Sequence, residues 1–202
     1  MKLFTEIEAA RERWDVLQHP FYQRWSEGTL TRDELATYAG QYRHAVVALA
    51  AASRHAADAD AGLREHADEE ASHVALWDDF ARTVGGDTDA APTAETRACA
   101  DAWAGEDRSL LEHLVALYAI EAAQPAISET KRAGLLRFYD VDEGPATAYF
   151  DVHVELDHEH AAAGRALLEE RAADADPVAL AAAAETVLRA NWELLDGVDA
   201  LR

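Results

Sequence analysis

Three side chains that can bind a metal ion lie on one stretch of the chain: His153, Asp157 and His160. The surrounding sequence, FDVHVELDHEHAAAGRALLEE, predicts a helix, and on a helix these positions share one face. The same face continues through the apolar or small residues Phe150, Gly164 and Leu167. Burying three polar side chains on such a face is costly unless something binds them. The spacing therefore indicates a metal site inside the protein.

Two other predicted helices offer ligands of the same kind. Glu70 and His73 are one helical turn apart, in a Glu-x-x-His arrangement that also occurs in helical di-iron proteins. Glu69 competes with Glu70 for this role, and we prefer Glu70 because it shares a face with Trp77. Glu121 interrupts the apolar face of a third helix. The predicted ligands of a two-metal centre are therefore Glu70, His73, Glu121, His153, Asp157 and His160.

The types of these ligands indicate which metal they hold. A mixture of carboxylates and imidazoles suits iron or manganese better than calcium or a closed structural zinc site. We expect two iron ions, with manganese left open, and dioxygen as a co-substrate at the free coordination positions. His66 lies on the face of Glu70 and is expected to support the ligands. The alternative is that the helix with His153, Asp157 and His160 is exposed to solvent, since Glu155 and His158 make its other side polar as well.

Lys131 is unusual because the chain has only one other lysine, Lys2. It occupies a core-facing position ten residues after Glu121, and a buried lysine readily loses its charge and can donate a proton. The alternative is a lysine whose amine reaches solvent and pairs with Glu129 or Asp142. Several tyrosines could line a cavity beside it, although each alone is more often a core residue: Tyr22, Tyr38, Tyr42, Tyr118 and Tyr149.

Helical periodicity runs through almost the whole chain, and strand signals are nearly absent. We predict helices at about 4–17, 19–27, 31–57, 59–84, 92–104, 107–138, 145–171 and 177–197. Thr31 and Glu34 form a capping-box pattern, Asp107 could cap the sixth helix and Pro145 could start the seventh. No linker or repeat suggests a second domain. The fold class is therefore all-α, with residues 1–202 forming one domain.

Composition limits the partners and the compartment. The 202 residues are 50% hydrophobic and carry a net charge of −21, which resembles a cytoplasmic protein from a high-salt organism. Such a surface should repel nucleic acid and anionic lipid. The first residues lack the apolar segment of a signal peptide, and no run approaches the roughly 18 apolar residues of a membrane span. Cys99 is the only cysteine, so no intrachain disulfide can form and a cytoplasmic location is expected.

Four segments together resemble the haem-oxygenase-like di-iron oxidases: HPFYQRWSEGTLTRDEL, DEEASHVALWDDF, LYAIEAAQPAISETK and YFDVHVELDHEH. The most similar branch is that of the CADD-like proteins, within the TenA/PqqC structural superfamily. The resemblance spans roughly residues 10–170. It implies a compact bundle of seven to eight helices that binds no haem. It also implies metal ligands at the six positions named above, with Glu69 as the alternative to Glu70.

The resemblance further implies a reaction. The CADD-like branch makes the p-aminobenzoate unit of folate in an oxygen-dependent reaction that consumes one of its own tyrosines, with a lysine as amino donor. The matching residues are Lys131 and Tyr22, and Tyr149 matches a cavity tyrosine. This chain departs from the branch in the short spacing between Glu70 and His73 and in having Ile120 where a tyrosine occurs. The spacing is closer to that of members that decarboxylate fatty acids, so a separate small-molecule substrate stays open.

Two other functions are compatible with the same scaffold. A TenA-type hydrolase of thiamine fragments needs a nucleophilic cysteine, but Cys99 is far in sequence from the predicted site and reads as a small buried residue. A non-catalytic helical binding or regulatory module is the other alternative, although the acidic charge disfavours DNA binding. Four tryptophans could supply the contact area of a homodimer: Trp14, Trp25, Trp103 and Trp192.

Overall fold

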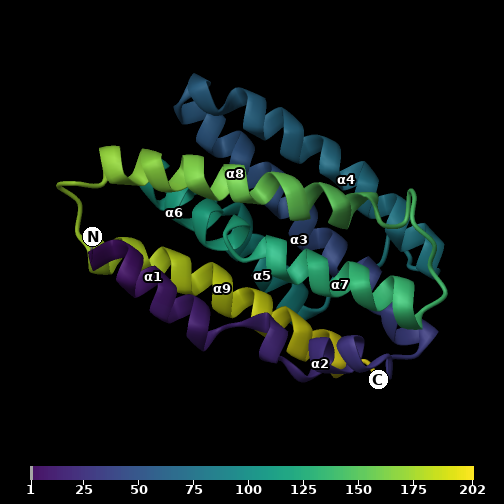
Figure 1. Cartoon of the computed structure of the whole chain (residues 1–202). Coiled ribbons are helices and arrows are strands. Elements are labelled where there is room, and N and C mark those ends of the chain that lie inside the picture. The colour runs from purple at the N-terminus through teal and green to yellow at the C-terminus, as the bar shows by residue number, and fades with distance from the viewer. Residues whose placement is uncertain (1) are drawn as a thin grey trace.

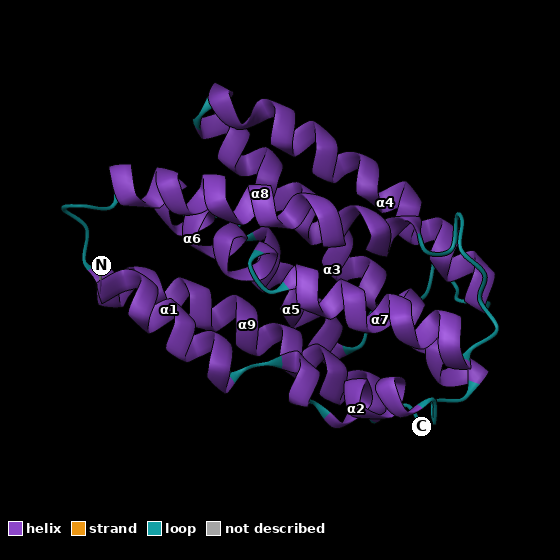
Figure 2. Cartoon of the chain, viewed as in Figure 1, coloured by secondary structure: helices purple, strands orange, loops and turns teal. Residues whose placement is uncertain are grey.

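The computed structural model describes residues 2–202, and this part of the chain folds into helices without a strand (Figure 2). The predicted all-α class is confirmed. The helices are α1 (Lys2–Arg13), η1 (Val16–Gln18), α2 (Pro20–Glu27), α3 (Arg32–Ala59), η2 (Ala61–Leu63), α4 (Arg64–Val84), α5 (Ala94–Ala104), α6 (Leu110–Glu121), α7 (Gln124–Phe138), α8 (Ala148–Arg171) and α9 (Pro177–Asp199), where η marks a 3-10 helix. Across residues 2–202, none of these helices combines the length and apolar character that crossing a membrane requires.

The helices pack in a bundle in which α3 and α8 each contact several of the others. In Figure 1, α8 runs through the middle of the view, with α4 above it and α6 and α7 below, and it packs against all three. Helix α3 packs against α4, α5 and α6. The first and last helices, α1 and α9, lie side by side along the lower edge (Figure 1). The three helices that carry the predicted ligands are therefore neighbours.

Local sequence signals explain two of the helix ends. Thr31 and Glu34 form the expected capping box, in which each side chain accepts a hydrogen bond from the other residue's backbone N–H. Gly85 ends α4 in the left-handed region at φ 81°, which a glycine adopts without strain. These signals fix where α3 begins and where α4, which carries Glu70 and His73, ends.

Two predicted helix starts are wrong in detail. Asp107 does not cap α6, because Ser109 does so in a second capping box with Glu112. Pro145 does not open the next long helix, because it lies in the turn before α8, which starts after Thr147. In both cases the helix starts three residues after the predicted start, at Leu110 and at Ala148.

The predicted helix at 107–138 is divided into α6 and α7 by a turn at Ala122 and Ala123. Pro125 explains the break, because it has no N–H to donate to the carbonyl of Glu121 and its ring would collide with that carbonyl. Arg11 donates from Nη2 to the freed carbonyl of Ala122 at 2.9 Å. The break places Glu121 at the last turn of one helix and the lysine segment on another.

Two of the four tryptophans assigned to an interface belong to the core instead. Trp25 and Trp103 are almost fully buried, and each donates its indole N–H to a backbone carbonyl inside the protein. Their assignment to an interface is therefore wrong. Trp14 and Trp192 are half-buried and pack edge to face, with ring centroids 6.3 Å apart. The homodimer stays a prediction that rests on these two residues alone.

Candidate metal centre

The predicted ligands meet between α4 and α8. Ligand atoms of Glu70 and His73 from α4 and of His153 from α8 all lie within 4.8 Å of one another. A second such group joins Glu70 with Asp157 and His160. Glu70 belongs to both groups, so its carboxylate occupies the position between two neighbouring sites. The geometry thus brings together five of the six residues that the sequence singled out.

Within residues 2–202, several buried polar atoms of these five side chains have no hydrogen-bond partner. They are Glu70 Oε1, His73 Nδ1, His153 Nε2, both carboxylate oxygens of Asp157 and His160 Nδ1. Buried polar atoms in folded proteins are nearly always paired, so a cluster of unpaired ones calls for a ligand. Nitrogen and carboxylate donors in this number and arrangement fit iron. The residues present therefore suit the metal, while their individual roles as ligands stay predictions.

His153 is held in the form that a metal ligand needs. Its Nδ1 donates to the backbone carbonyl of Tyr149 at 2.6 Å, which leaves Nε2 as the acceptor that faces the centre. Burial lowers the pKa of His153 to about 4, so the ring is neutral at physiological pH. A hydrogen bond within α8 thus fixes both the orientation and the tautomer of this side chain.

The pKa values of Asp157 and His160 are shifted in directions that a bound cation would reverse. Burial raises the pKa of the Asp157 carboxyl group to about 7. The neighbouring Asp157 carboxylate, 3.6 Å away, raises the pKa of His160 to about 9. A carboxylate held away from water gains its proton unless positive charge is supplied, and a metal ion supplies it. A metal ion would therefore keep Asp157 ionised and displace the proton of His160, whose neutral ring is the form that binds metal.

Glu121, the sixth predicted ligand, lies beside these groups without being part of them. It is buried, and its Oε1 is 3.0 Å from Nε2 of His66 on α4. Burial raises the pKa of the Glu121 carboxyl group, and the hydrogen bond to His66 opposes that rise. His66 thus contacts a predicted ligand, as the sequence analysis expected of it.

Glu69 and Glu70 take different places. Glu70 is 2% exposed and points into the centre, whereas the side chain of Glu69 is 38% exposed. The Glu69 Oε2 atom is 3.2 Å from Nε2 of His160, the ring nitrogen that faces away from Asp157. A carboxylate on the outer nitrogen of a ligating histidine orients the ring and fixes its tautomer. Glu69 therefore contacts His160 from the more exposed side and forms a third possible ligand group with His66 and His160, while Glu70 is the more buried glutamate and its role as the ligand stays a prediction.

Lys131 lies next to the centre among buried aromatic side chains, which together with it form the lysine chamber. It is 1% exposed, its Nζ has no hydrogen-bond partner, and burial lowers its pKa to about 7. The distances from Nζ to the surrounding ring centroids are 4.4 Å to Tyr42, 5.2 Å to Tyr22, 5.6 Å to Tyr38, 5.6 Å to Trp77 and 5.8 Å to Phe150. The alternative of a lysine that reaches solvent and pairs with an acid is wrong, because α7 packs this face against α2 and α8.

Aromatic rings connect the chamber to the predicted ligands. Tyr149 stacks on His153 with ring centroids 4.1 Å apart, and Trp77 lies 4.9 Å from Tyr149. On the far side of the chamber, the hydroxyls of Tyr22 and Tyr38 are 2.7 Å apart in a hydrogen bond. The three residues predicted to take part in catalysis, Tyr22, Lys131 and Tyr149, therefore belong to one connected set of buried side chains.

Trp77 and Phe150 also surround the Lys131 amine, although their positions in the sequence predict only core residues. Trp77 could have been found, because it lies one turn after His73 on the same helix face. Tyr118, which was expected with the other cavity tyrosines, lines a different pocket beside Glu121. The helical repeat predicts which residues of one helix lie on the same face, but it does not predict which other helix packs against that face.

Cys99 cannot serve as the nucleophile of a hydrolase in this arrangement. The side chain is fully buried, and burial raises the pKa of its thiol. A protonated thiol is a poor nucleophile. The expectation that Cys99 is a small buried residue is confirmed.

Comparison with known proteins places the chain in a family. The model of a family described as iron-containing redox enzymes matches residues 36–192. The chain belongs to this family. The chain is 31% identical to the 4-aminobenzoate synthase of Nitrosomonas europaea, and the match covers 96% of this chain and 89% of the relative. It is 30% identical to the 4-aminobenzoate synthase of Chlamydia muridarum, over 97% of this chain and 89% of the relative.

Solved structures with the same fold confirm the predicted architecture. A haem-oxygenase-like domain of unknown function from Shewanella denitrificans has a TM-score of 0.82 at 18% identity, covering 100% of this chain and 93% of its own. A TenA homologue from Pseudomonas syringae has a TM-score of 0.83 at 16% identity, covering 98% of this chain and 91% of its own. This iron-containing redox enzyme therefore has the haem-oxygenase-like fold.

Proposed function

We propose that this protein makes 4-aminobenzoate in an oxygen-dependent reaction that takes the ring of its own Tyr22 and the side-chain nitrogen of Lys131. The relatives named 4-aminobenzoate synthase support the product. The observation that carries the assignment is the Lys131 amine, which is buried, unpaired and 5.2 Å from the centroid of the Tyr22 ring. In a protein with one other lysine, such a placement is difficult to explain by packing.

Two iron ions, held by Glu70, His73, Glu121, His153, Asp157 and His160, would supply the activation of dioxygen. The protein orients its donor atoms before any metal arrives, through the bond from His153 to the Tyr149 carbonyl and the contact between Glu69 and His160. Because Glu70, His73, His153 and Asp157 are buried, the same packing keeps bulk water away from the centre.

Lys131 can provide a neutral amine. Its pKa of about 7 leaves a large fraction deprotonated at physiological pH, and its Nζ has no hydrogen-bond partner to occupy the lone pair. The Tyr22 hydroxyl shares a hydrogen bond with Tyr38, so Tyr38 can hold or return a proton at the Tyr22 oxygen. Tyr149 lies between this pair and the predicted ligands, since it stacks on His153.

Isotope labels that are transferred to the product identify the residues that donate its ring and its nitrogen. Protein labelled with ¹⁵N in the lysine side chains and ¹³C in the tyrosine rings is loaded with ferrous iron without oxygen and then exposed to oxygen. We expect 4-aminobenzoate that carries one ¹⁵N and a labelled ring, with matching losses in the peptides that contain Tyr22 and Lys131. Lys131→Arg keeps the charge but not the deprotonatable amine, so it should give no product, whereas Lys2→Arg should behave as the unchanged protein.

Peptide mapping also distinguishes Tyr22 from its neighbours, because the Tyr42 ring is closer to the Lys131 amine, at 4.4 Å. Product that lacks ¹⁵N, or product formed by Lys131→Arg, would contradict the role of the lysine. An intact Tyr22 together with a modified Tyr42 would contradict the assignment of the ring donor.

A second candidate function is oxidation of a separate apolar substrate. A cavity of about 340 Å³ is lined in part by Glu121 and His160, and none of the aromatic residues around Lys131 lines it. Its walls are mostly apolar and comprise Leu63, Leu114, Leu117, Tyr118 and Leu167. If this function operates, a small apolar acid should accelerate oxygen consumption by the iron-loaded protein while Tyr22 and Lys131 stay intact. Oxygen uptake that is unaffected by such compounds would exclude it.

A further inference from the structure

The cavity between α3, α4, α6 and α8 gives access to only part of the predicted metal centre. Glu121 and His160 line it, and it opens to solvent beside the exposed residues Gly62, Glu65 and Ala163. The other four predicted ligands are 1–3% exposed and do not line it: Glu70, His73, His153 and Asp157. An ion that enters through this cavity therefore meets Glu121 and His160 before the buried ligands.

The charges around this cavity favour a cation. Within residues 2–202, its lining includes the carboxylates of Glu65, Glu69 and Glu121 but no lysine or arginine. A cleft that is lined by one sign of charge raises the local concentration of the opposite ion, and the net charge of −21 adds to this effect. A divalent cation is therefore drawn to the cavity.

Three side chains that line the cavity form a possible metal site outside the buried ligands. Ligand atoms of His66, Glu69 and His160 lie within 4.8 Å of one another. Their side chains are 22%, 38% and 14% exposed, so solvent reaches them more easily than the buried ligands. Two imidazoles and one carboxylate are a donor set that binds ferrous iron in proteins and leaves coordination positions open. We call these three residues the outer site.

The distances within the outer site suit a shared ion. Glu69 Oε2 is 3.2 Å from Nε2 of His160. Two ligand atoms that each lie about 2.1 Å from one ion, at right angles, are about 3 Å from each other. This pair of atoms can therefore share an ion as well as a proton. The His66 ring lies beside the pair, since its centroid is 4.5 Å from that of His160.

The outer site also contacts the predicted centre. His160 belongs to the second ligand group, and its Nδ1 is 3.6 Å from Oδ1 of Asp157. Nε2 of His66 is 3.0 Å from Oε1 of Glu121. An ion at the outer site would therefore lie next to two predicted ligands while it is still close to solvent. This arrangement suits an entry path in which the ion exchanges one ligand at a time.

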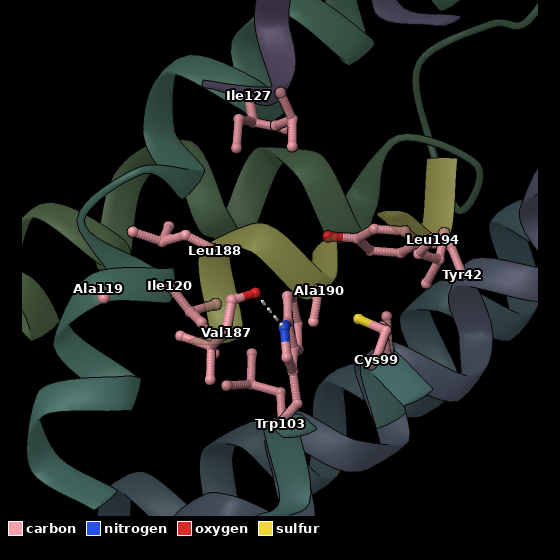
Figure 3. Close-up of a cluster of buried hydrophobic side chains, with 14 of the residues drawn as sticks. Tyr42, Cys99, Trp103, Ala119, Ile120, Ile127, Val187, Leu188, Ala190 and Leu194 are labelled. Carbon is pink, nitrogen blue, oxygen red and sulfur yellow. Dashed lines mark hydrogen bonds between the residues drawn. The ribbon is translucent and has the colours of Figure 1, made fainter. Parts of the chain in front are cut away.

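An apolar cluster lies on another side of α6. Ala119 and Ile120, which directly precede Glu121, belong to the same buried cluster as Trp103 and Val187 (Figure 3). The Trp103 indole donates to the Val187 carbonyl inside this cluster. Moving a charged ion through such packing is costly. The cavity is therefore the favoured approach to Glu121.

We propose that His66, Glu69 and His160 bind a divalent metal ion as it enters through the cavity, before the ion moves to the buried ligands. The inference rests on the metal centre of the proposed function. It gives His66 a role besides its contact with Glu121, and it gives Glu69 a role besides its contact with His160. Metal uptake should then pass through a state in which the ion occupies only the outer site.

The rate of uptake tests this order of events. Metal-free protein is mixed with Co²⁺, and its visible absorption is followed in a stopped-flow instrument. The rate should rise with the Co²⁺ concentration and then saturate, because the ion first fills the outer site and then moves inward. In His66→Gln the amide can still donate to Glu121 but is a poorer ligand than imidazole, so uptake should be about tenfold slower at low Co²⁺ and should not saturate.

Filling the cavity is an independent test that leaves the outer site unchanged. Ala163 is exposed and lines the cavity, whereas its neighbour Ala162 is exposed on the same helix and does not line it. We expect Ala163→Trp to slow uptake about tenfold and to reach the same final number of ions per chain, measured by elemental analysis. Ala162→Trp is the matched control and should take up Co²⁺ as fast as the unchanged protein. This comparison carries the test if His66→Gln does not fold.

Saturable uptake by His66→Gln, uptake by the unchanged protein that does not saturate, or equal rates in the two tryptophan variants would overturn the inference. Failure of the proposed function would differ from these outcomes. If the unchanged protein took up no metal, the proposed metal centre would be refuted together with the outer site. If uptake followed the expected pattern but iron and oxygen gave no 4-aminobenzoate, the outer site would stand and the proposed synthesis would be refuted.

Discussion

Replacing Lys131 by methionine should stabilise the protein at neutral pH. Burial lowers the pKa of Lys131 from 10.5 to about 7, and its Nζ has no hydrogen bond or ion pair to offset that burial. Each pKa unit corresponds to about 1.4 kcal/mol, so keeping this amine in the interior costs the folded state about 5 kcal/mol. Methionine has a similar length and no charge, and its thioether packs well against aromatic rings. We expect Lys131→Met to raise the free energy of unfolding by up to about 5 kcal/mol.

The gain in the free energy of unfolding from Lys131→Met should depend on pH in a way that is specific to a buried lysine. Below pH 7 both the folded and the unfolded chain carry the proton, and the full cost of burial is present. Between pH 7 and 10.5 the unfolded chain binds more protons, so the stability of the unchanged protein rises with pH. The advantage of Lys131→Met should therefore shrink by about 1.4 kcal/mol per pH unit above pH 7.

Urea unfolding of the metal-free protein measures the difference at several pH values from about 6 to about 9.5. The buried tyrosines and Cys99 are present in both the unchanged protein and Lys131→Met, so their contributions cancel from the difference in unfolding free energy. Lys2→Met is the control, because Lys2 is exposed and its replacement should give a profile parallel to that of the unchanged protein. A difference between Lys131→Met and the unchanged protein that stays constant across the range would refute the argument.

Three further outcomes test the metal centre and the chamber. His153→Ala should lose most of the roughly two irons expected per chain, measured by elemental analysis, whereas His158→Ala on the exposed side of the same helix should retain them. Glu69→Gln should weaken iron binding by about tenfold or more in a competition with a chelator, because its carboxylate supports a ligating histidine, whereas Glu65→Gln should have no effect. The rate of product formation should rise with pH through about 7 and then level off, because only the neutral amine of the buried lysine is reactive.

The ligands on α8 could be predicted from sequence because one helix carries three of them. The helical repeat fixes the relative directions of His153, Asp157 and His160 whatever surrounds the helix. The Glu-x-x-His pair on α4 is predictable for the same reason, and the structure brings both motifs within 4.8 Å. The break after Glu121 could also have been foreseen, since Pro125 cannot continue the hydrogen-bond ladder.

Contacts between separate helices could not be predicted in this way. The Lys131 amine meets Tyr22 from α2 and Tyr42 from α3, and neither distance follows from any spacing in the chain. The same limit explains the wrong assignment of Trp25 and Trp103 to an interface, because an amphipathic indole suits both a surface patch and a core with a nearby carbonyl. Whether a tryptophan lies at the surface or in the core depends on which helix packs against it.

The composition of the chain gives a reason for the identity of residue 131. Eighteen basic residues include only two lysines, so arginine is the usual cation of this protein. Arginine cannot lose its proton in a protein, whereas a lysine buried among aromatic rings can. A cost of about 5 kcal/mol is a large part of the 5 to 15 kcal/mol by which domains are usually stable. A position that keeps lysine at such a cost, in a chain that otherwise favours arginine, is best explained by a requirement for the neutral amine at Lys131.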